Sequence, residues 1–197
     1  MTKTVLLTGA TDGIGLATVQ KMAADGHTLL LHGRNEEKLS RVKDQLLAQY
    51  PGLSVSVYQA NLAQLHDVLS MAQEIRQHHQ HIDVLINNAG VHAKPSEPNP
   101  QRLDPRYVVN TIAPFMLVQE LRNLLHARSR VINVASAAQH PLQAQELTGN
   151  STQGDGVVYA KSKLALIMWT YAQAMSFTPA APRYIWSIPN LCWAARW

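Results

Sequence analysis

The sequence of 197 residues contains a single cysteine, Cys192. One cysteine excludes an internal disulfide framework and a cysteine-based zinc cage. Long apolar runs are also missing, since nothing approaches the roughly 18 uninterrupted apolar residues typical of a membrane-spanning helix. Met1 to Thr4 leads straight into an apolar run that starts at Val5, which leaves no room for a signal peptide. We therefore expect a reduced, globular, cytoplasmic protein without a membrane span.

Charged residues are scarce as well, at 15% of the chain, whereas hydrophobic residues make up 46%. An average soluble domain carries about 25% charged residues. This composition excludes extensive disorder, and the length corresponds to one domain at roughly 150 residues per domain. The net charge of +4 would suit a nucleic-acid partner. Lysines and arginines are scattered singly, however, so we expect no nucleic-acid binding.

Short apolar runs alternate with amphipathic stretches, which is typical of β-α-β units and a parallel sheet. The pattern predicts a doubly wound parallel sheet of the Rossmann type in three α/β/α layers. The expected strands are residues 5–8, 29–31, 54–58, 84–86 and 130–134. The expected helices are residues 16–24, 36–49, 62–77, part of 106–126, and 157–176. Residues 94–100 and 139–156 are expected to be loops because they are rich in proline or in polar residues and glycine.

A glycine-rich turn, residues 9–15, lies between the first expected strand and the first expected helix. Glycines allow positive φ angles there and let backbone N–H groups approach a pyrophosphate at the helix N-terminus. Residues 87–90, Asn-Asn-Ala-Gly, close the fourth expected strand, and ligands of open α/β sheets bind beyond the carboxyl ends of the strands. Taken singly, either segment is equally well read as a tight turn.

Polar residues suited to acid–base chemistry follow at the same edge of the sheet. Ser136 comes after the fifth expected strand, and Tyr159 and Lys163 are four residues apart on an expected helix, so they share a face. A lysine ammonium close to a phenol favours the phenolate, which makes tyrosine usable as an acid or base. On its own the Tyr-x-x-x-Lys spacing is also compatible with a solvated helix face.

Together these motifs resemble the short-chain dehydrogenase/reductase family over residues 3–176. The matching motifs occur in family order: Thr8-Gly9-x-x-x-Gly13-Ile14-Gly15, Asn87-Asn88-Ala89-Gly90, Asn110, Ser136 and Tyr159-x-x-x-Lys163. The separation of 23 residues between Ser136 and Tyr159 (159 minus 136) is similar to that of retinol-dehydrogenase-like members.

The resemblance implies a mechanism with four catalytic residues, and no metal. Tyr159 would exchange a proton with an alcohol or carbonyl substrate while hydride passes to or from a nicotinamide. Ser136 would hydrogen-bond the substrate oxygen, and Lys163 would hold the nicotinamide ribose and tune Tyr159. Asn110 would support a water-linked proton path to Lys163. Self-association through the helices that hold Asn110 and Tyr159 is also implied by the resemblance.

The resemblance further implies a set of cofactor-binding residues: Gly9, Thr11, Asp12, Gly13, Ile14, Gly15, Arg34, Asn61, Leu62, Asn88, Ala89, Gly90, Tyr159 and Lys163. Members that use NAD(H) usually carry an acidic residue near the end of the second strand. Arg34 stands there instead and suits a 2′-phosphate, so NADP(H) is favoured over NAD(H). The alternative reading of Arg34 is an exposed cap of the next helix. Asn61 replaces the usual aspartate, although its oxygen can accept the same bond.

The last residues look foreign to the rest of the chain. No Asp or Glu occurs after Asp155, and three of the four tryptophans fall in the last twelve residues. A one-base shift of the reading frame over residues 186–197 permits Val-Asn-Pro-x-Ser-Leu-Leu-Gly-x-Lys-Met, which looks like a family strand end and substrate loop.

We therefore expect a cofactor-binding domain at 1–176 and an atypical tail at 177–197, a frameshift product that lacks the last family strand and helix. A native, divergent short C-terminus is the alternative. Two function hypotheses follow: an NADP(H)-dependent oxidoreductase, or a C-terminally truncated nucleotide-binding domain with little or no catalytic activity.

Overall fold

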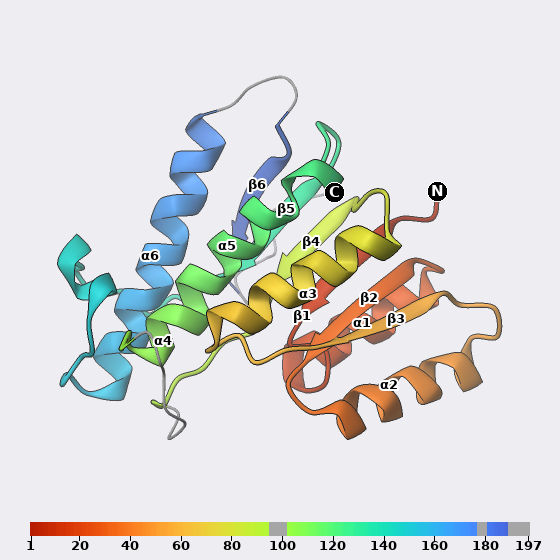
Figure 1. The fold of residues 1–197 in the computed structure, drawn as a ribbon, viewed down its shortest axis with the longest axis horizontal. Helices are drawn as coiled ribbons and strands as arrows, with labels where there is room; N and C mark the ends of the chain where they lie inside the picture. The colour runs from red at the N-terminus through yellow and green to blue at the C-terminus, as the bar shows by residue number, and fades with distance from the viewer. Residues whose placement is uncertain (95–101, 177–180, 189–197) are drawn as a thin grey trace.

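The computed structural model describes residues 1–94, 102–176 and 181–188. Its described strands form one six-stranded sheet in the order β3-β2-β1-β4-β5-β6, and every neighbouring pair is parallel (Figure 1). The strands are β1 (Thr4–Thr8), β2 (Thr28–Gly33), β3 (Val55–Gln59), β4 (Val84–Asn87), β5 (Arg130–Val134) and β6 (Arg183–Ser187). The α-helices are α1 (Gly13–Ala24), α2 (Glu36–Gln49), α3 (Leu65–His78), α4 (Pro105–Tyr107), α5 (Ala113–Glu120) and α6 (Asp155–Met175). Tighter or wider helical turns are η1 (Val108–Ile112), η2 (Arg122–Leu124) and η3 (Ala144–Thr148).

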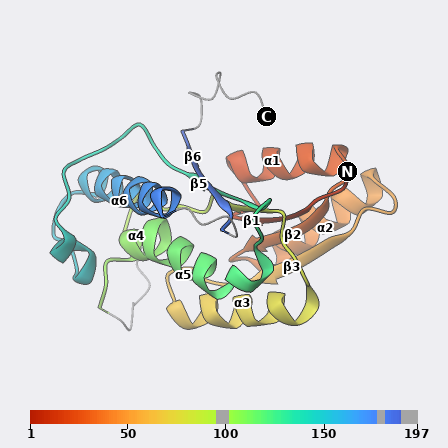
Figure 2. The same cartoon turned by 90° about the horizontal axis from the view of Figure 1, so that it is seen from above.

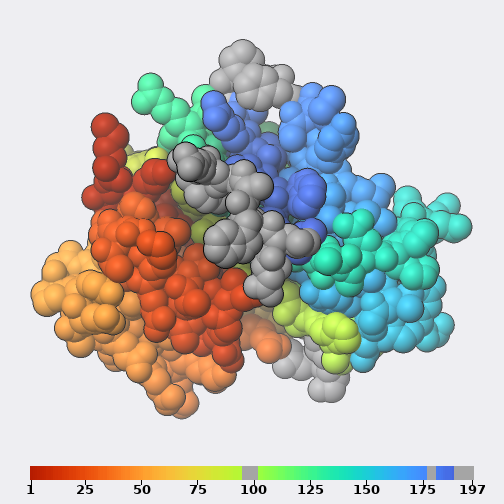
Figure 3. Space-filling view, turned by 180° about the vertical axis from the view of Figure 1, so that it is seen from behind, coloured from red at the N-terminus to blue at the C-terminus, as the bar shows by residue number. Residues whose placement is uncertain are grey.

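Helices cover both faces of the sheet, which confirms the predicted three-layer α/β/α arrangement. Side chains alternate across β1, so that Val5 and Leu7 pack with α1 and α2 while Leu6 packs with α3 and α5. Figure 2 shows α1 on one side of the strands and α3 with α5 on the other. The strand order also separates the two halves of the chain, which occupy opposite sides of the molecule in Figure 3. Among the described helices, none is long and apolar enough to cross a membrane.

The sixth strand was not predicted, because residues 183–187 were assigned to the atypical tail, although residues 184–186 form a short apolar run. β6 nevertheless pairs with β5 in register from Arg130 opposite Arg183 to Val134 opposite Ser187. It lies beyond residue 176, in the stretch assigned to the tail, and yet it is part of the sheet. Tyr184 packs edge-on to Trp169 of α6, with ring centres 6.4 Å apart. Residues 189–197, which carry most of the frameshift hypothesis, lie outside the described residues, as does most of the expected loop at 94–100.

The helix expected within residues 106–126 is interrupted by the wide turn η1. Pro114 has no N–H, so it cannot donate to the carbonyl of Asn110 four residues earlier, and its ring crowds that carbonyl. The chain widens there, and the N–H of Ala113 donates to the carbonyl of Val108. Such single wide turns are frequent at functional sites. The expected loop at 139–156 also differs, since it contains η3 and the first residues of α6.

A buried ion pair holds the segment before α4 against the start of α6. The Arg106 side chain is 1% exposed and donates Nε and Nη2 to the two carboxylate oxygens of Asp104, at 2.9 and 2.7 Å, and Nη1 to Asp155. Burial alone would raise the pKa of Asp104, but the hydrogen bonds from Arg106 outweigh it and hold that pKa below its usual value. Asp104 also accepts the N–H of Ser151 and so fixes the long segment between β5 and α6.

The substitution Asp104→Asn should lower the free energy of unfolding by about 3 kcal/mol, because it leaves the buried guanidinium without its bidentate partner. Urea unfolding followed by circular dichroism measures this. Asp25→Asn, at a surface pair with Lys21, is the matched control and should change stability by less than about 0.5 kcal/mol. Equal effects of the two substitutions would contradict this account of the Asp104–Arg106 pair.

Candidate functional site

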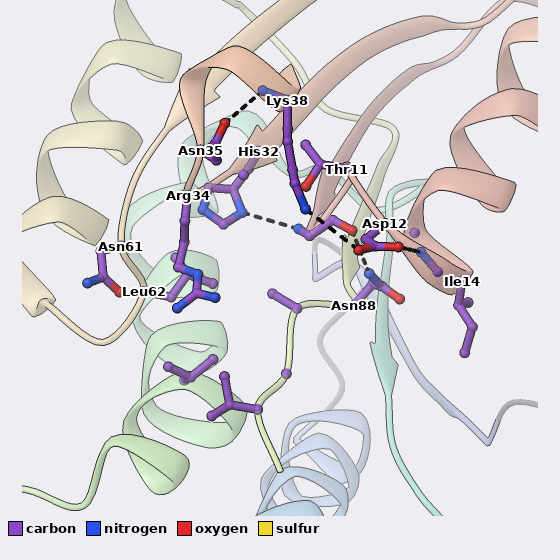
Figure 4. Close-up of a pocket in the computed structure, with 18 of the residues that line it drawn as sticks. Thr11, Asp12, Ile14, His32, Arg34, Asn35, Lys38, Asn61, Leu62 and Asn88 are labelled. Carbon is purple, nitrogen blue, oxygen red and sulfur yellow. Dashed lines mark hydrogen bonds and ion pairs between the residues drawn. The ribbon is translucent and has the colours of Figure 1, made fainter. Parts of the chain in front are cut away.

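A cleft of about 810 Å³ lies at the carboxyl edge of the sheet, lined by the turns that follow β1, β2, β3 and β4 (Figure 4). Every residue predicted to bind the cofactor, apart from Tyr159 and Lys163, lines this cleft. The sequence analysis missed several further lining residues, which are His32, Gly33, Asn35, Lys38, Ala63, Val91 and Val109. These sit beside the predicted residues in the chain or on the facing helix, and no motif identifies them.

The turn after β1 has the geometry of an anion-binding helix N-terminus. Gly9 and Gly13 adopt φ angles of +70° and +49°, a region that side chains disfavour. The Asp12 carboxylate caps α1 by accepting the N–H of Gly13 at 2.8 Å. A Cβ atom built on Gly15 would lie 1.9 Å from the carbonyl oxygen of Gly9, so only glycine fits there. The turn therefore brings backbone N–H groups to the cleft without side-chain obstruction.

Asn88, after β4, holds one side of this turn. Its Nδ2 donates to the carbonyls of Thr8 and Gly9, at 2.9 and 3.1 Å. In return, Thr8 Oγ1 accepts the backbone N–H groups of Asn88 and Ala89 at 3.0 and 3.1 Å. Asn88 was predicted to bind the cofactor, but its side-chain amide N–H groups support the turn after β1.

His32, near the end of β2, holds the other side. The N–H of Gly9 donates to His32 Nδ1 at 3.3 Å, and His32 Nε2 lies 3.1 Å from the carbonyl of Ala60 beyond β3. The side chain is 1% exposed, and burial lowers its pKa to about 4. The imidazole is therefore neutral at physiological pH.

Positive side chains gather at the entrance to α2. Arg34 lines the cleft directly after β2, while the N-cap of α2 is Asn35, whose Oδ1 accepts the N–H of Lys38 at 2.8 Å. The Lys38 ammonium reaches across the cleft to within 3.9 Å of the Asp12 carboxylate. Arg34 is thus not the helix cap, and it stands with Lys38 as a pair of cations beside the glycine-rich turn.

Asn61 shapes the turn after β3. Its Oδ1 accepts the N–H of Ala63 at 3.1 Å, and its own N–H donates to the Asp67 carboxylate at 3.0 Å. This places Leu62 and Ala63 along the wall of the cleft.

Asn110 is fully buried in η1 and fastens the segment after β4. Its Oδ1 accepts the N–H of Val91 at 2.8 Å, and its Nδ2 donates to the carbonyl of Val91 and to Ser162 Oγ, both at 2.9 Å. The side chain therefore joins η1, the segment after β4 and α6 in one place.

Lys163 projects from α6 toward the cleft. Its Nζ donates to the carbonyl of Val134 at 2.8 Å and lies 6.0 Å from the centre of the Tyr159 ring. Burial lowers the pKa of Lys163 to about 8. A Cβ atom on Gly90 would lie 3.3 Å both from Lys163 Nζ and from Asn110 Oδ1, so these two residues meet the cofactor cleft at Gly90.

The remaining two predicted catalytic residues are partly exposed at the same edge. The ring of Tyr159 lies against that of His92, with centres 5.0 Å apart. Ser136 Oγ follows β5 and accepts the N–H of Ala138 at 3.1 Å. The cleft and the predicted catalytic residues therefore lie next to each other at one edge of the sheet. No group of residues suited to a metal ion occurs within the described ranges.

Comparisons with known proteins agree with this geometry. A family model described as short chain dehydrogenase matches residues 3–181. Human retinol dehydrogenase 11 is 31% identical over 172 residues, covering 85% of this chain and 54% of the relative. Human polyprenol dehydrogenase is 27% identical over 177 residues, covering 86% of this chain and 54% of the relative. The chain thus spans about half the length of these curated relatives.

A solved structure gives the same result for the fold. A metagenomic short-chain oxidoreductase in complex with NADP is 26% identical and superposes with a TM-score of 0.71, covering 94% of this chain and 80% of the other.

The substitution Gly15→Ala should abolish measurable binding of a dinucleotide and lower the free energy of unfolding by at least about 2 kcal/mol. The new methyl group would strike a backbone oxygen that cannot move without opening the turn. Gly156→Ala on α6 is the control, because its Cβ meets open space and should be neutral or slightly stabilising. Cofactor fluorescence and thermal unfolding measure the two effects. Unchanged binding in Gly15→Ala would contradict the role given to the turn.

Proposed function

This chain belongs to the short-chain dehydrogenase family, and we propose that it is an oxidoreductase that interconverts an alcohol and a carbonyl with NADP(H). The observation that carries the proposal is the junction at Gly90, where the dinucleotide-shaped cleft meets Lys163 and Asn110. Relatives named for the oxidation of retinol and polyprenol favour a small-molecule alcohol or the corresponding carbonyl as substrate.

The residues of the cleft fit a dinucleotide. A Cβ atom on Gly15 would lie 1.9 Å from the carbonyl oxygen of Gly9, so the turn and the start of α1 pack this closely only with glycine there. A pyrophosphate would rest at the N-terminus of α1, where the helix dipole and the backbone N–H groups of the first turn favour an anion. A bound nicotinamide supplies the hydride donor or acceptor that the protein itself lacks.

The chain's own residues would handle the proton and the charge. Tyr159 would give a proton to a carbonyl oxygen or take one from an alcohol, and Ser136 would donate a hydrogen bond to the same oxygen. Lys163, whose pKa is about 8, is mostly cationic at neutral pH and would hold the ribose next to Gly90. Asn110 would keep the segment after β4 and α6 in register, so that the Lys163 ammonium meets the cleft.

Preference for NADP(H) rests on Arg34 and Lys38. A guanidinium forms paired hydrogen bonds with a phosphate, and a second cation nearby adds attraction. The similarity to a short-chain oxidoreductase in complex with NADP supports this choice.

A second candidate function is a nucleotide-binding domain with little or no turnover. The two candidates share the cleft and differ in whether a carbonyl is reduced.

Self-association is proposed through α5 and α6. Large apolar side chains are exposed on these helices, namely Phe115, Met168, Tyr171 and Met175. Such exposed apolar groups are typical of interaction surfaces. The cytoplasmic location stays a prediction from the sequence.

Turnover is tested by assaying NADPH oxidation with a panel of aldehydes and ketones, comparing the wild type with Tyr159→Phe. Removing the hydroxyl should lower kcat at least about 100-fold, as expected for loss of a general acid, while leaving the Kd for NADPH within about threefold. Tyr171→Phe changes an exposed tyrosine on the same helix and should leave both unchanged. Full activity in Tyr159→Phe would contradict the proposed role, whereas cofactor binding by a wild type that reduces no carbonyl would favour the second candidate.

Coenzyme choice is tested by Arg34→Ala. Loss of a charged partner for the 2′-phosphate should raise the Kd for NADPH about tenfold or more and leave the Kd for NADH nearly unchanged. Arg41→Ala, further along α2 and outside the cleft, is the control. An equal rise for both coenzymes would show that Arg34 does not read the 2′-phosphate.

A further inference from the structure

His32 ties together the ends of three strands beneath the cleft. It stands in β2, accepts a hydrogen bond from Gly9 after β1, and contacts the carbonyl of Ala60 after β3. Figure 4 shows its ring lying beside the glycine-rich turn, with the contact to that turn drawn as a dashed line. The side chain is 1% exposed, so water does not replace either partner.

The two partners fix which nitrogen of His32 carries the proton. The backbone N–H of Gly9 is only a donor, so Nδ1 must be an unprotonated acceptor. The Ala60 carbonyl is only an acceptor, so Nε2 must carry the hydrogen. Burial keeps the ring neutral, since it lowers the pKa of His32 to about 4.

We propose that His32 is a positioning residue for the cofactor, which holds the glycine-rich turn in its binding shape by accepting the Gly9 N–H. This inference rests on the proposed function, because it concerns the same cleft. Asn88 Nδ2 secures the carbonyl of Thr8 at 2.9 Å, and His32 secures the N–H of Gly9 at 3.3 Å. These two groups belong to the same peptide unit, which is thereby held from both sides, and the turn is ordered before a ligand arrives.

A pre-ordered turn binds its ligand more tightly because no ordering is required during binding. Without the acceptor on His32, the partly buried Gly9 N–H loses its partner, and we expect the peptide to rotate to recover a hydrogen bond. Rotation moves the donors that follow it away from the pyrophosphate. The effect falls on the part of the cofactor that NADPH and NADH share.

Three substitutions of His32 distinguish the loss of the hydrogen-bond acceptor at Nδ1 from the loss of the ring's volume. His32→Asn places an oxygen near the position of Nδ1 and keeps the acceptor for Gly9. His32→Gln places its amide near Nε2 and keeps only the bond to Ala60. His32→Phe keeps the ring volume without either nitrogen. His66→Asn, at an exposed histidine on α3, is the matched control.

The measurement is the Kd of the full chain for NADPH and for NADH by fluorescence titration, with the melting temperature of each variant recorded in parallel. His32→Phe and His32→Gln should raise both Kd values by the same factor, about tenfold. His32→Asn should stay within about threefold of the wild type, and kcat at saturating NADPH should be nearly unchanged in every variant. A merely structural role would instead make the Kd follow the melting temperature, with no rescue by asparagine.

Two outcomes would overturn the inference. One is wild-type affinity in His32→Phe, and the other is a long-range ¹H–¹⁵N spectrum of the wild type in which His32 carries its proton on Nδ1. Failure of the proposed function looks different, because the wild type itself would then bind neither cofactor, or would bind NADPH without reducing any carbonyl. The tautomer measurement remains decisive in that case, since it needs no ligand.

Discussion

The site depends on how the single peptide unit between Thr8 and Gly9 is held. The Thr8 carbonyl is bound by Asn88, which follows β4, and the Gly9 N–H is bound by His32 near the end of β2. Because parallel strands end at one edge, residues far apart in the chain converge on this peptide. The absence of a side chain at Gly15 then lets α1 begin directly against the carbonyl of Gly9, with the N–H of Gly13 capped by Asp12. Because these backbone groups are hydrogen-bonded within the protein, we expect the turn to be ordered before any cofactor binds.

A second junction, at Gly90, couples this turn to the proposed catalytic residues. The Asn110 side chain hydrogen-bonds the N–H and the carbonyl of Val91, and it also donates a hydrogen bond to Ser162 Oγ of α6. Lys163, one residue further along α6, is therefore set at a fixed distance from the cleft. Its burial is unfavourable for an ammonium, and the carbonyl of Val134 offsets part of that penalty. A cation kept partly desolvated interacts more strongly with whatever approaches it.

Much of the fold follows from the sequence, because apolar runs such as residues 5–7 and 29–31 are buried on both faces and have little alternative. The glycine-rich turn and the tyrosine–lysine pair are also visible, since local spacing alone sets their geometry. Three features were not predicted. β6 has an apolar run of only three residues and is placed by pairing with β5. η1 arises from a clash between Pro114 and the preceding turn, which a helical periodicity does not reveal. The role of His32 comes from partners 23 residues before it and 28 residues after it, and no local pattern carries such contacts.

The central claim is that the turn after β1 receives the dinucleotide. Hydrogen–deuterium exchange of the full chain, with and without saturating NADP⁺, tests it most directly. We predict slower exchange of the amides in residues 9–15 and 88–90, and no change in residues 44–49 at the C-terminal end of α2, none of which lines the cleft. Protection confined to other segments, or no protection at all, would contradict the account.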